Sequence, residues 1–445
     1  MKKLRMPAYI TRALSLIEAA GKEAWPVGGC VRDLLLGRVP GDYDLAASAL
    51  PDEIKRIFGG FTVIETGIKH GTVTVLMDSH PVEITTLRRD GEYADSRHPA
   101  SVSFTDRIEE DLARRDFTVN AMAYSENEGI IDPFGGIDDL ESRLIRCVGD
   151  PQKRFSEDAL RILRTLRFAS VLGFEIEKDT AEAARRLAPT LSAISRERIR
   201  DEFVKLICGR DALRILRDFS DVIAVIIPEI KPCVGFDQKS PHHIHDVYGH
   251  CIHAVAATEP IAELRIAALL HDIEKPRCFF IGSDGYGHCR GHAQMSAETS
   301  QRILSGLRFD NRTVQRIVRL IRLHDSYPSP NRVAVRRDIA ACGTDLWYRL
   351  EALRKADSAA KAPGAYGDEN EYFTRVHELA DAIINEGDCL SLDSLAVDGN
   401  DIRILTNDKK SVGNVLNSLL EGVIGGSLPN ERAALITKAK ELLTK

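Results

Sequence analysis

The sequence lacks several features that mark particular classes of protein. It has no run of about 18 uninterrupted apolar residues, so a membrane-spanning helix is not expected. The basic start, Met1–Arg5, leads into an amphipathic pattern rather than the apolar core of a signal peptide. The nine cysteines are scattered and form no Cys-x-x-Cys pair, which favours reduced thiols in a cytoplasmic protein. The chain also shows no fixed-period repeat and no low-complexity tract.

The charge balance limits the kinds of partner. A formal net charge of −6 argues against indiscriminate nucleic-acid binding, so any RNA site must be a local basic surface. Between Arg143 and Arg210 the chain has 15 Lys or Arg residues against 10 Asp or Glu, which is such a local surplus. A set of solvated helix faces would give the same count.

The order of patterns predicts a small α+β head followed by a long helical body. The 445 residues suffice for two to four domains. In the first part, Thr72–Met77 and Pro81–Leu87 are predicted strands joined by a turn at 78–80, and the polar stretch Arg88–Pro99 is a predicted loop. After the breaker cluster at 132–136, helical periodicity dominates to the end of the chain.

A glycine turn and two carboxylates stand close together near the start of the chain. Gly28-Gly29 opens a predicted helix whose first turn carries Arg32, and Asp42 and Asp44 follow. Helix-start amides and an arginine suit a polyphosphate. Residues two apart in an extended segment point to the same face, so the two aspartates can share a divalent cation. A triphosphate cradle beside a paired-carboxylate metal site predicts nucleotidyl transfer.

Two further positions belong to this first hypothesis. Glu83, on a neighbouring predicted strand, is a candidate third carboxylate, with an exposed strand residue as the alternative. Arg114 and Arg115 point about 100° apart on a regular helix, so they cannot both face one partner. We expect one of them to reach the phosphates and the other to pair with Asp111 or Asp116. A surface cluster of ion pairs is the alternative.

A third block, Glu157–Arg167, suggests how a base could be selected. Asp158, Arg161 and Arg164 recur every three residues beside a stripe of leucines, which an ordinary amphipathic helix would also show. Asp158 could accept from the amino group of cytosine or adenine, and Arg161 could donate to the neighbouring ring acceptors. Uracil and guanine would face the aspartate with an acceptor and leave a buried charge unpaired. Such a pair admits C and A without a template.

These three blocks, in this order and spacing, resemble the motifs of class II CCA-adding tRNA nucleotidyltransferases, and the resemblance extends to the block Ser195–Ile199. That family belongs to the polymerase-β-like superfamily. The resemblance therefore implies an α+β polymerase-β-like nucleotidyltransferase head followed by an elongated all-α body. It also implies that Asp42 and Asp44 are catalytic and hold Mg²⁺. The residues implied to contact the phosphates and sugar are Gly29, Arg32 and Arg115. The residues implied to read the base or support its pocket are Asp158, Arg161, Arg164 and Arg167.

Two segments bear on which member of the superfamily the chain resembles. The segment Asp90–Pro99 is similar to the flexible loop with which full CCA-adding enzymes switch from C to A, so a variant that adds only CC is not favoured. Bacterial poly(A) polymerases share the same head but usually carry a basic-aromatic signature where this chain has Thr66–Thr72. This departure favours the tRNA enzyme.

A second candidate site lies in the helical body. The stretch Leu269–Pro276 resembles the signature of HD-type metal-dependent phosphohydrolases, and His250 and Asp325 stand where that family has its remaining ligands. Histidine and carboxylate side chains on successive helices can converge on one divalent metal. The ligands expected for this HD site are His250, His271, Asp272 and Asp325, with His292 and His324 nearby. The spacing of Cys278, His288, Cys289 and His292 matches no closed zinc pattern.

One departure from the HD signature bears on that site. The family usually has glycine where this chain has Glu274, and a glutamate would distort the site if the position needs a positive φ or a close helix approach. Metal binding, and turnover as a phosphohydrolase, are therefore separate hypotheses for this part of the chain.

The sequence as a whole predicts a cytoplasmic enzyme that adds C, C and A to the 3′ end of tRNA from CTP and ATP. The expected parts are a head at 1–142, a base-selecting and tRNA-binding neck at 143–230, an HD domain at 231–350 and a tRNA-contacting tail at 351–445. The expected cofactors are Mg²⁺ and, at the HD site, a second divalent ion (Mn²⁺, Ni²⁺ or Mg²⁺). The alternatives are a poly(A) polymerase or A-adding enzyme, an HD phosphohydrolase and a non-catalytic RNA-binding scaffold. Monomer and homodimer both stay open.

Overall fold

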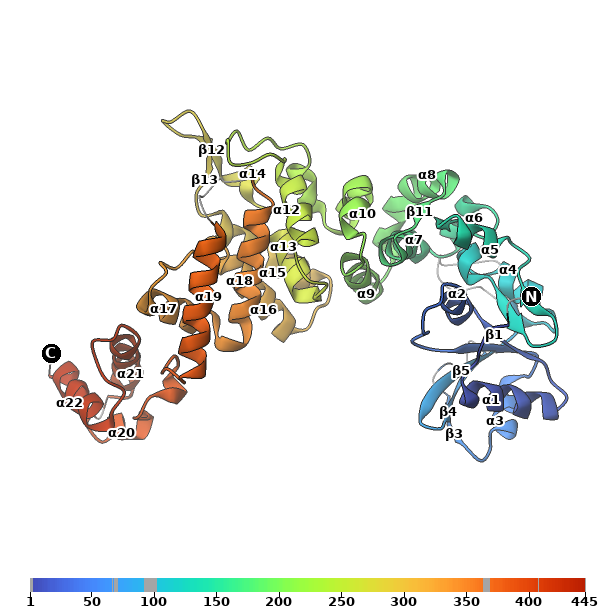
Figure 1. Cartoon of the computed structure of the whole chain (residues 1–445), viewed down its shortest axis with the longest axis horizontal. Coiled ribbons are helices and arrows are strands. Elements are labelled where there is room, and N and C mark those ends of the chain that lie inside the picture. The colour runs from blue at the N-terminus through green and yellow to red at the C-terminus, as the bar shows by residue number, and fades with distance from the viewer. Residues whose placement is uncertain are drawn as a thin grey trace. The chain divides into compact units, whose positions relative to one another are not determined.

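The chain forms two compact units, which are described separately. The computed structural model describes residues 3–65, 67, 71–91, 102–362, 369–406 and 408–444. The units are Met1–Pro228 and Glu229–Lys445 (Figure 1). The expected head and neck thus pack together as one unit, and the finer domain boundaries stay predictions.

The first unit begins with a mixed sheet, as the α+β head requires. Its seven strands follow the order β3-β4-β5-β2-β1-β8-β9, and all neighbours are antiparallel except β2 and β5, which run parallel. The strands are β1 Ala24–Val27, β2 Asp44–Ala47, β3 Thr62–Ile64, β4 Thr72–Met77, β5 His80–Thr86, β8 Ala123–Ser125 and β9 Gly129–Ile131. The parallel contact places the start of β2 beside the middle of β5.

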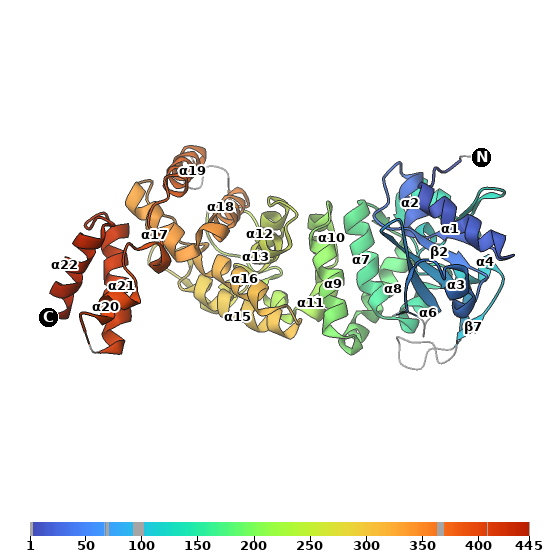
Figure 2. The ribbon, with the colours of Figure 1, turned by 90° about the horizontal axis from the view of Figure 1, so that it is seen from below.

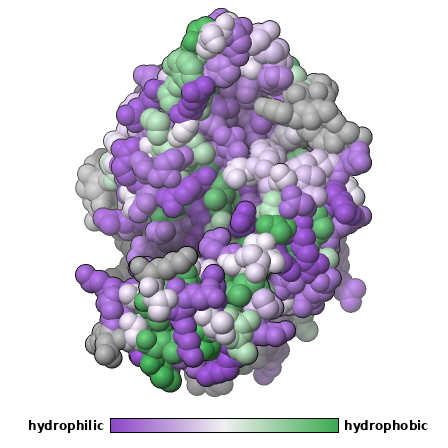
Figure 3. Space-filling model, turned by 90° about the vertical axis from the view of Figure 1, so that its left-hand side faces the viewer, coloured by the Kyte–Doolittle hydropathy of each residue, from purple (hydrophilic) through white to green (hydrophobic). Residues whose placement is uncertain are grey.

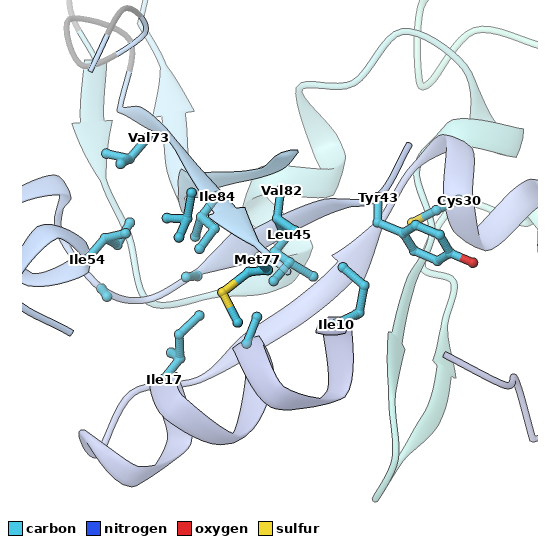
Figure 4. Packing of buried hydrophobic residues seen from close by; sticks show 14 of the residues in the cluster. Ile10, Ile17, Cys30, Tyr43, Leu45, Ile54, Val73, Met77, Val82 and Ile84 are labelled. Carbon is cyan, nitrogen blue, oxygen red and sulfur yellow. The ribbon is translucent and has the colours of Figure 1, made fainter. Parts of the chain in front are cut away.

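The sheet has an apolar layer on each face. On one face, Ile10 and Ile17 of α1 (Ala8–Ala19) pack with Leu45, Met77 and Ile84 of the strands (Figure 4). The short helix α3 (Pro51–Ile57) contributes to the same layer. The opposite face packs against α4 (Ile108–Ala113). Alternating strand residues feed the two layers, as a sheet covered on both sides requires.

The predicted hairpin is present with a tighter turn than expected. β4 ends at Met77, and β5 begins at His80, so the turn contains only Asp78 and Ser79. Both turn residues have positive φ, 49° and 68°, as the two central residues of a type I′ hairpin turn do. The predicted loop after it begins instead as a strand, because β6 (Arg88–Asp90) pairs with β7 (Val102–Phe104). Residues 92–99 of that loop lie outside the described residues.

The remainder of the first unit is helical, as predicted, apart from one pair of two-residue strands, β10 (Leu144–Ile145) and β11 (Glu175–Ile176). The helices are α2 Gly29–Leu35, α5 Gly136–Glu141, α6 Pro151–Glu157, α7 Leu160–Leu172, α8 Lys178–Leu187, α9 Arg196–Ile207, α10 Ala212–Asp218 and α11 Ser220–Ile226. Helices α7 and α9 lie side by side (Figure 2). Their contact brings two basic segments of the sequence together.

The second unit is built from helices and one hairpin. In it α12 packs against α13 and α18, and α15 packs against α16. The helices before the tail are α12 Val247–Ala256, α13 Ala262–Leu270, α14 Lys275–Cys278, α15 His292–Gly306, α16 Asn311–Leu323, α17 Arg332–Cys342, α18 Thr344–Ala359 and α19 Glu369–Asn385. The hairpin strands are β12 Phe279–Ile281 and β13 Gly287–Cys289.

The tail has an apolar core of its own, formed by residues between Cys389 and Leu443. Its helices are α20 Gly399–Arg403, α21 Lys409–Ile424 and α22 Arg432–Leu443. Hydrophilic side chains cover most of the face in Figure 3, and hydrophobic ones form small separate patches. All nine cysteines carry free thiols, as the sequence predicted. Within the described part of the chain, no helix combines the length and apolarity needed to cross a membrane.

Candidate functional site

One cavity of the first unit collects all nine residues that the sequence assigned to catalysis or nucleotide binding. Its volume is about 870 Å³. We call it the arginine-rich pocket. Its lining residues are Gly28, Gly29, Arg32, Asp42, Asp44, Arg114, Arg115, Asp116, Asn120, Asp158, Leu160, Arg161, Arg164, Arg167, Phe168, Val171, Leu172, Arg198, Lys205 and Cys208. Seven of these are arginines, so the pocket is complementary to an anion with several charges.

The carboxylates of the pocket lie where the sheet leads into it. Asp44 is the first residue of β2, and its partner across the parallel contact is Glu83 of β5. Side chains alternate along strands, so both project from the face opposite Leu45 and Ile84. Burial, together with the nearby Asp42 and Glu83 carboxylates, raises the pKa of Asp44 to about 6. Oxygen donors that repel one another in this way suit Mg²⁺, whose charge would relieve the repulsion.

The glycine turn before α2 makes room for an arginine. Gly28 has φ of 74°, and a Cβ atom there would lie 2.7 Å from Nη1 of Arg115. Any other residue would therefore displace this guanidinium and strain the backbone. Arg115 also contacts the buried Asp111 at 3.3 Å, and Arg114 contacts it at 2.7 Å. The expectation that one arginine pairs with Asp111 is met by Arg114, but Arg115 shares the same carboxylate.

A chain of hydrogen bonds links the glycine motif to α7. Arg32 donates to Oδ1 of Asn120 at 2.6 Å, and the Asn120 amide donates to Asp116 at 3.3 Å. Asp116 accepts two further hydrogen bonds from Arg164, at 2.6 and 2.8 Å. Burial alone would raise the pKa of Asp116, but Arg164 outweighs it and lowers that pKa to about 2. The pattern of the sequence did not predict this role of Asn120.

The two proposed base-reading residues lie in the pocket with partners of their own. Asp158 lies between α6 and α7 rather than on a regular helical stripe, and its Oδ1 accepts from the Leu160 amide. Its Oδ2 accepts from Arg198 of α9 at 2.9 Å. Arg161 donates to Glu157 at 2.7 Å and to the Arg114 carbonyl at 3.1 Å. The expectation that Asp158 shares one helical stripe with Arg161 and Arg164 was thus wrong. The contact with Arg198 was not predicted.

A second site, in the second unit, is a buried group of histidines and aspartates. His250, His271, Asp272 and Asp357 offer ligand atoms within 4.8 Å of one another, and Asp272 forms a second such group with His292 and His324. We call these six residues the His/Asp cluster. It borders a cavity of about 310 Å³, which is also lined by Lys275 and Lys361.

The histidines of the cluster all present the same ring nitrogen to it. Each Nδ1 faces a backbone carbonyl oxygen, at 3.3 Å for His250, 2.8 Å for His271, 2.8 Å for His292 and 2.6 Å for His324. Because a carbonyl only accepts, a neutral ring carries its proton on Nδ1 and directs the Nε2 lone pair inward. These are the donors that a divalent transition metal prefers.

Asp272 lies at the centre of the cluster. Its Oδ2 is 3.2 Å from Nε2 of His271 and 2.6 Å from Nζ of Lys275, and its Oδ1 is 3.2 Å from Nε2 of His292. Neither oxygen accepts a well-aligned hydrogen bond among the described residues. Burial would raise the pKa of Asp272, but His271 and Lys275 hold it well below its usual range. A buried carboxylate lacking directed donors fits a metal ligand.

Three expectations about this site can be compared with the structure. His250, His271 and Asp272 are brought together as predicted, but Asp357 of α18 completes their group in place of Asp325. The Asp325 side chain is 58% exposed, and its Oδ2 lies 3.9 Å from Nε2 of His292. Glu274 adopts a φ of −97° and is held by Arg277, so the position does not require glycine.

Family models match two regions of the chain. Residues 24–146 match the model described as "Poly A polymerase head domain". Residues 173–233 match the model described as "Probable RNA and SrmB- binding site of polymerase A". The first region contains the carboxylates and the glycine turn, and the second contains α9.

Individual relatives extend the similarity along the chain. A CCA-adding enzyme from Streptococcus mutans is 33% identical over 447 residues, which is 98% of each chain. A CCA-adding enzyme from Geobacillus thermodenitrificans is 53% identical over 196 residues, covering 44% of this chain and 48% of its own. The solved structure of the Bacillus stearothermophilus CCA-adding enzyme in complex with CTP is similar with a TM-score of 0.71. It is 29% identical and covers 99% of this chain and 98% of its own.

Proposed function

The chain belongs to the family of CCA-adding enzymes, nucleotidyltransferases that act on tRNA, and we propose that it builds the CCA end from CTP and ATP in the arginine-rich pocket. The 3′ hydroxyl of tRNA attacks the α-phosphate of the nucleotide, and pyrophosphate leaves. The observation that carries this proposal is the convergence of Asp42, Asp44 and seven arginines on one cavity. Carboxylates for a cation and guanidinium groups for a triphosphate are the two requirements of this chemistry.

Each group of the pocket has a proposed task. Asp42 and Asp44, with Glu83 beside Asp44, would hold Mg²⁺. The bound ion neutralises phosphate charge and favours deprotonation of the attacking hydroxyl. Arg32 and Arg115, beside the glycine turn, bind the phosphates and sugar. These contacts fix the nucleotide so that its α-phosphate lies next to the carboxylates.

Base selection is assigned to the junction before α7. Asp158 accepts from the exocyclic amino group of C or A, and the base replaces Arg198 as donor to Oδ2. Arg161, held by Glu157, is oriented to donate to a ring acceptor. Uracil and guanine present an acceptor to the same aspartate, which leaves that charge without a donor. The protein itself then replaces a template.

The test of this function is addition to tRNA that lacks its terminal CCA. We expect the purified protein to incorporate labelled CTP twice and ATP once, and then to stop. A poly(A) polymerase would instead extend the RNA with many A residues, and an A-adding enzyme would require a tRNA that already ends in CC. Absence of any incorporation with Mg²⁺ present would refute the proposal. The cytoplasm, where this substrate is processed, is the proposed location.

A second activity, metal-dependent phosphoester hydrolysis, is proposed for the His/Asp cluster. The inward Nε2 atoms and the two aspartates would hold one or two divalent cations, and Lys275 and Lys361 at the cavity wall would attract a phosphate. The bound metal supplies an activated water for hydrolysis. The test uses protein loaded with Mn²⁺ or Ni²⁺. A nucleoside 2′,3′-cyclic phosphate should be opened to a nucleoside monophosphate, and a nucleoside 2′-monophosphate should release inorganic phosphate. The same preparation should lose this hydrolytic activity after treatment with a chelator.

A further inference from the structure

Phe168 is an aromatic residue of the arginine-rich pocket whose role follows from its neighbours. It lies on α7, is half-buried and lines the cavity. The guanidinium carbons of Arg32, Arg164 and Arg167 lie over its ring, at 5.3, 5.4 and 3.9 Å from the ring centroid. Arg32 comes from α2, so the ring connects arginines of two elements that are distant in sequence.

The ring is itself held in place. Its centroid lies 5.6 Å from that of Phe117 in an edge-to-face arrangement, with 76° between the ring planes. Phe117 is fully buried, and its neighbour Asp116 binds Arg164. The position of the Phe168 ring is therefore fixed by packing, independently of the arginines that surround it.

The three arginines need something to hold them together. Asp116 pairs with Arg164, and Glu202 pairs with Arg167 at 3.1 Å. Burial lowers the pKa of Arg167, and the neighbouring Arg164 and Arg32 lower it further, while Glu202 opposes the change. Arg32 also has an acidic partner, Asp33, at 2.9 Å. The guanidinium groups still repel one another, and the aromatic ring adds an attraction to those of the three ion pairs.

We propose that Phe168 is a positioning residue whose ring gathers Arg32, Arg164 and Arg167 at the spacing that binds the triphosphate of the incoming nucleotide. An aromatic face attracts a guanidinium through its quadrupole and adds no negative charge. The arginines therefore keep their net charge for the phosphates, which a further carboxylate at this place would cancel. The proposal rests on the proposed function of the pocket.

The test compares Phe168→Leu with Phe168→Tyr in the full-length protein. The first removes the aromatic face but keeps an apolar side chain, and the second keeps the face. For Phe168→Leu we expect KM for both CTP and ATP to rise about 10-fold with kcat within about twofold of wild type. For Phe168→Tyr, both constants stay within about twofold of wild type. An unchanged KM in the leucine variant, or equal defects in the two variants, overturns the proposal.

Binding measured without turnover separates this proposal from the function on which it rests. Inorganic tripolyphosphate should bind Phe168→Leu about 10-fold more weakly than wild type, whereas cytidine, which has no phosphate, should bind both equally. Phe61→Leu is the matched control, because Phe61 carries a comparable contact with Arg12 (5.3 Å) that does not line the pocket. If cytidine binding falls instead, the ring contacts the base and the positioning role is wrong. Failure of wild-type protein to extend tRNA would refute the function alone.

Discussion

The arginine-rich pocket and the His/Asp cluster both concentrate charge, but they use opposite groups to do so. Seven guanidinium groups line the first, and four imidazoles with two carboxylates form the second. Arginine stays protonated and can only donate, whereas neutral histidine and carboxylate offer lone pairs. The arginines of the first site are therefore complementary to an anion, whereas the second site is complementary to a cation.

The two sites also differ in access. Asp42 is exposed and Asp44 is partly buried in a cavity of about 870 Å³, whereas His250 and His271 have no exposed surface. A nucleotide must enter and pyrophosphate must leave in every cycle, so this site has to stay open. A metal can stay bound through many cycles, and burial strengthens its contacts. This difference in access is what the two proposed roles require, an open site for substrate and a buried site for a resident ion.

The largest expected effect comes from removing the catalytic carboxylates of the arginine-rich pocket. Replacing Asp42 and Asp44 by alanine should lower nucleotide incorporation by at least about 1,000-fold, because Glu83 alone would then remain to hold the cation beside the triphosphate. The measurement is transfer of labelled CTP to tRNA lacking CCA. His271→Gln, which alters only the buried cluster, should retain transfer within about twofold. Equal losses in both variants would contradict the division of labour.

The next largest effect concerns which aspartate belongs to the His/Asp cluster. Asp357→Asn should weaken Mn²⁺ binding by at least about 100-fold, since even outer partners of metal ligands contribute 10- to 100-fold. Asp325→Asn, at an exposed position, should change the affinity by less than about threefold. Isothermal titration with Mn²⁺ on the full-length proteins measures both. If Asp325→Asn weakens Mn²⁺ binding more than Asp357→Asn does, the original prediction of Asp325 as a metal ligand would be supported instead.

The contrast between Asp325 and Asp357 shows what the sequence can and cannot reveal. The glycine turn, Asp42 and Asp44 are close in sequence, and β1, α2 and β2 follow one another, so local pattern alone predicted their convergence. The residues of the His/Asp cluster lie on, or just after, helices that are far apart in the sequence. Helical periodicity predicts each helix, but not that α18 packs against α12 and α13. Asp357 joins the cluster through this tertiary packing of α18, which the pattern of the sequence does not predict.

The same limit explains the junction at Asp158. The stretch from Glu157 to Leu160 contains no glycine or proline, so nothing in it predicts that one helix ends and another begins there. The pairing of Asp158 with Arg198 depends on the packing of α9 and could not be found from spacing. A polar break can thus be hidden within an apparently continuous helical stripe.

A smaller effect tests base selection within the open pocket. Asp158→Ala should raise incorporation of UTP or GTP relative to CTP and ATP by about 50-fold, because the charge that rejects an acceptor is removed. Competition between labelled nucleotides on the same tRNA measures the ratio. Arg198→Ala is the informative control, since it keeps Asp158 and should retain the preference for C and A. An unchanged preference in Asp158→Ala would rule out the assigned role.

The smallest expected effect is on the free energy of unfolding of the first unit, with the second unit as the reference. Asp116 is buried, and Arg164 lowers its pKa from 3.8 to about 2. This shift corresponds to about 2 kcal/mol in the free energy of unfolding, or a factor of about 30 in the folding equilibrium constant. Asp116→Asn should lose this contribution at pH 7. Because the folded pKa is the lower one, the contribution is present above about pH 4 and disappears as the pH falls through 2. At pH 3 about half of the difference should remain.

Fluorotryptophan labelling can follow this loss in each unit separately. Trp25 lies in the first unit and Trp347 in the second, and the chain has two tryptophans, so ¹⁹F spectra during urea unfolding report on both units at once. Asp116→Asn should shift the Trp25 transition and leave that of Trp347 unchanged. Asp221→Asn removes a half-exposed carboxylate paired with Arg185, and it should shift neither by more than about 0.5 kcal/mol. A matching shift at Trp347 would mean that the units unfold together, so the effect could no longer be assigned to the open pocket.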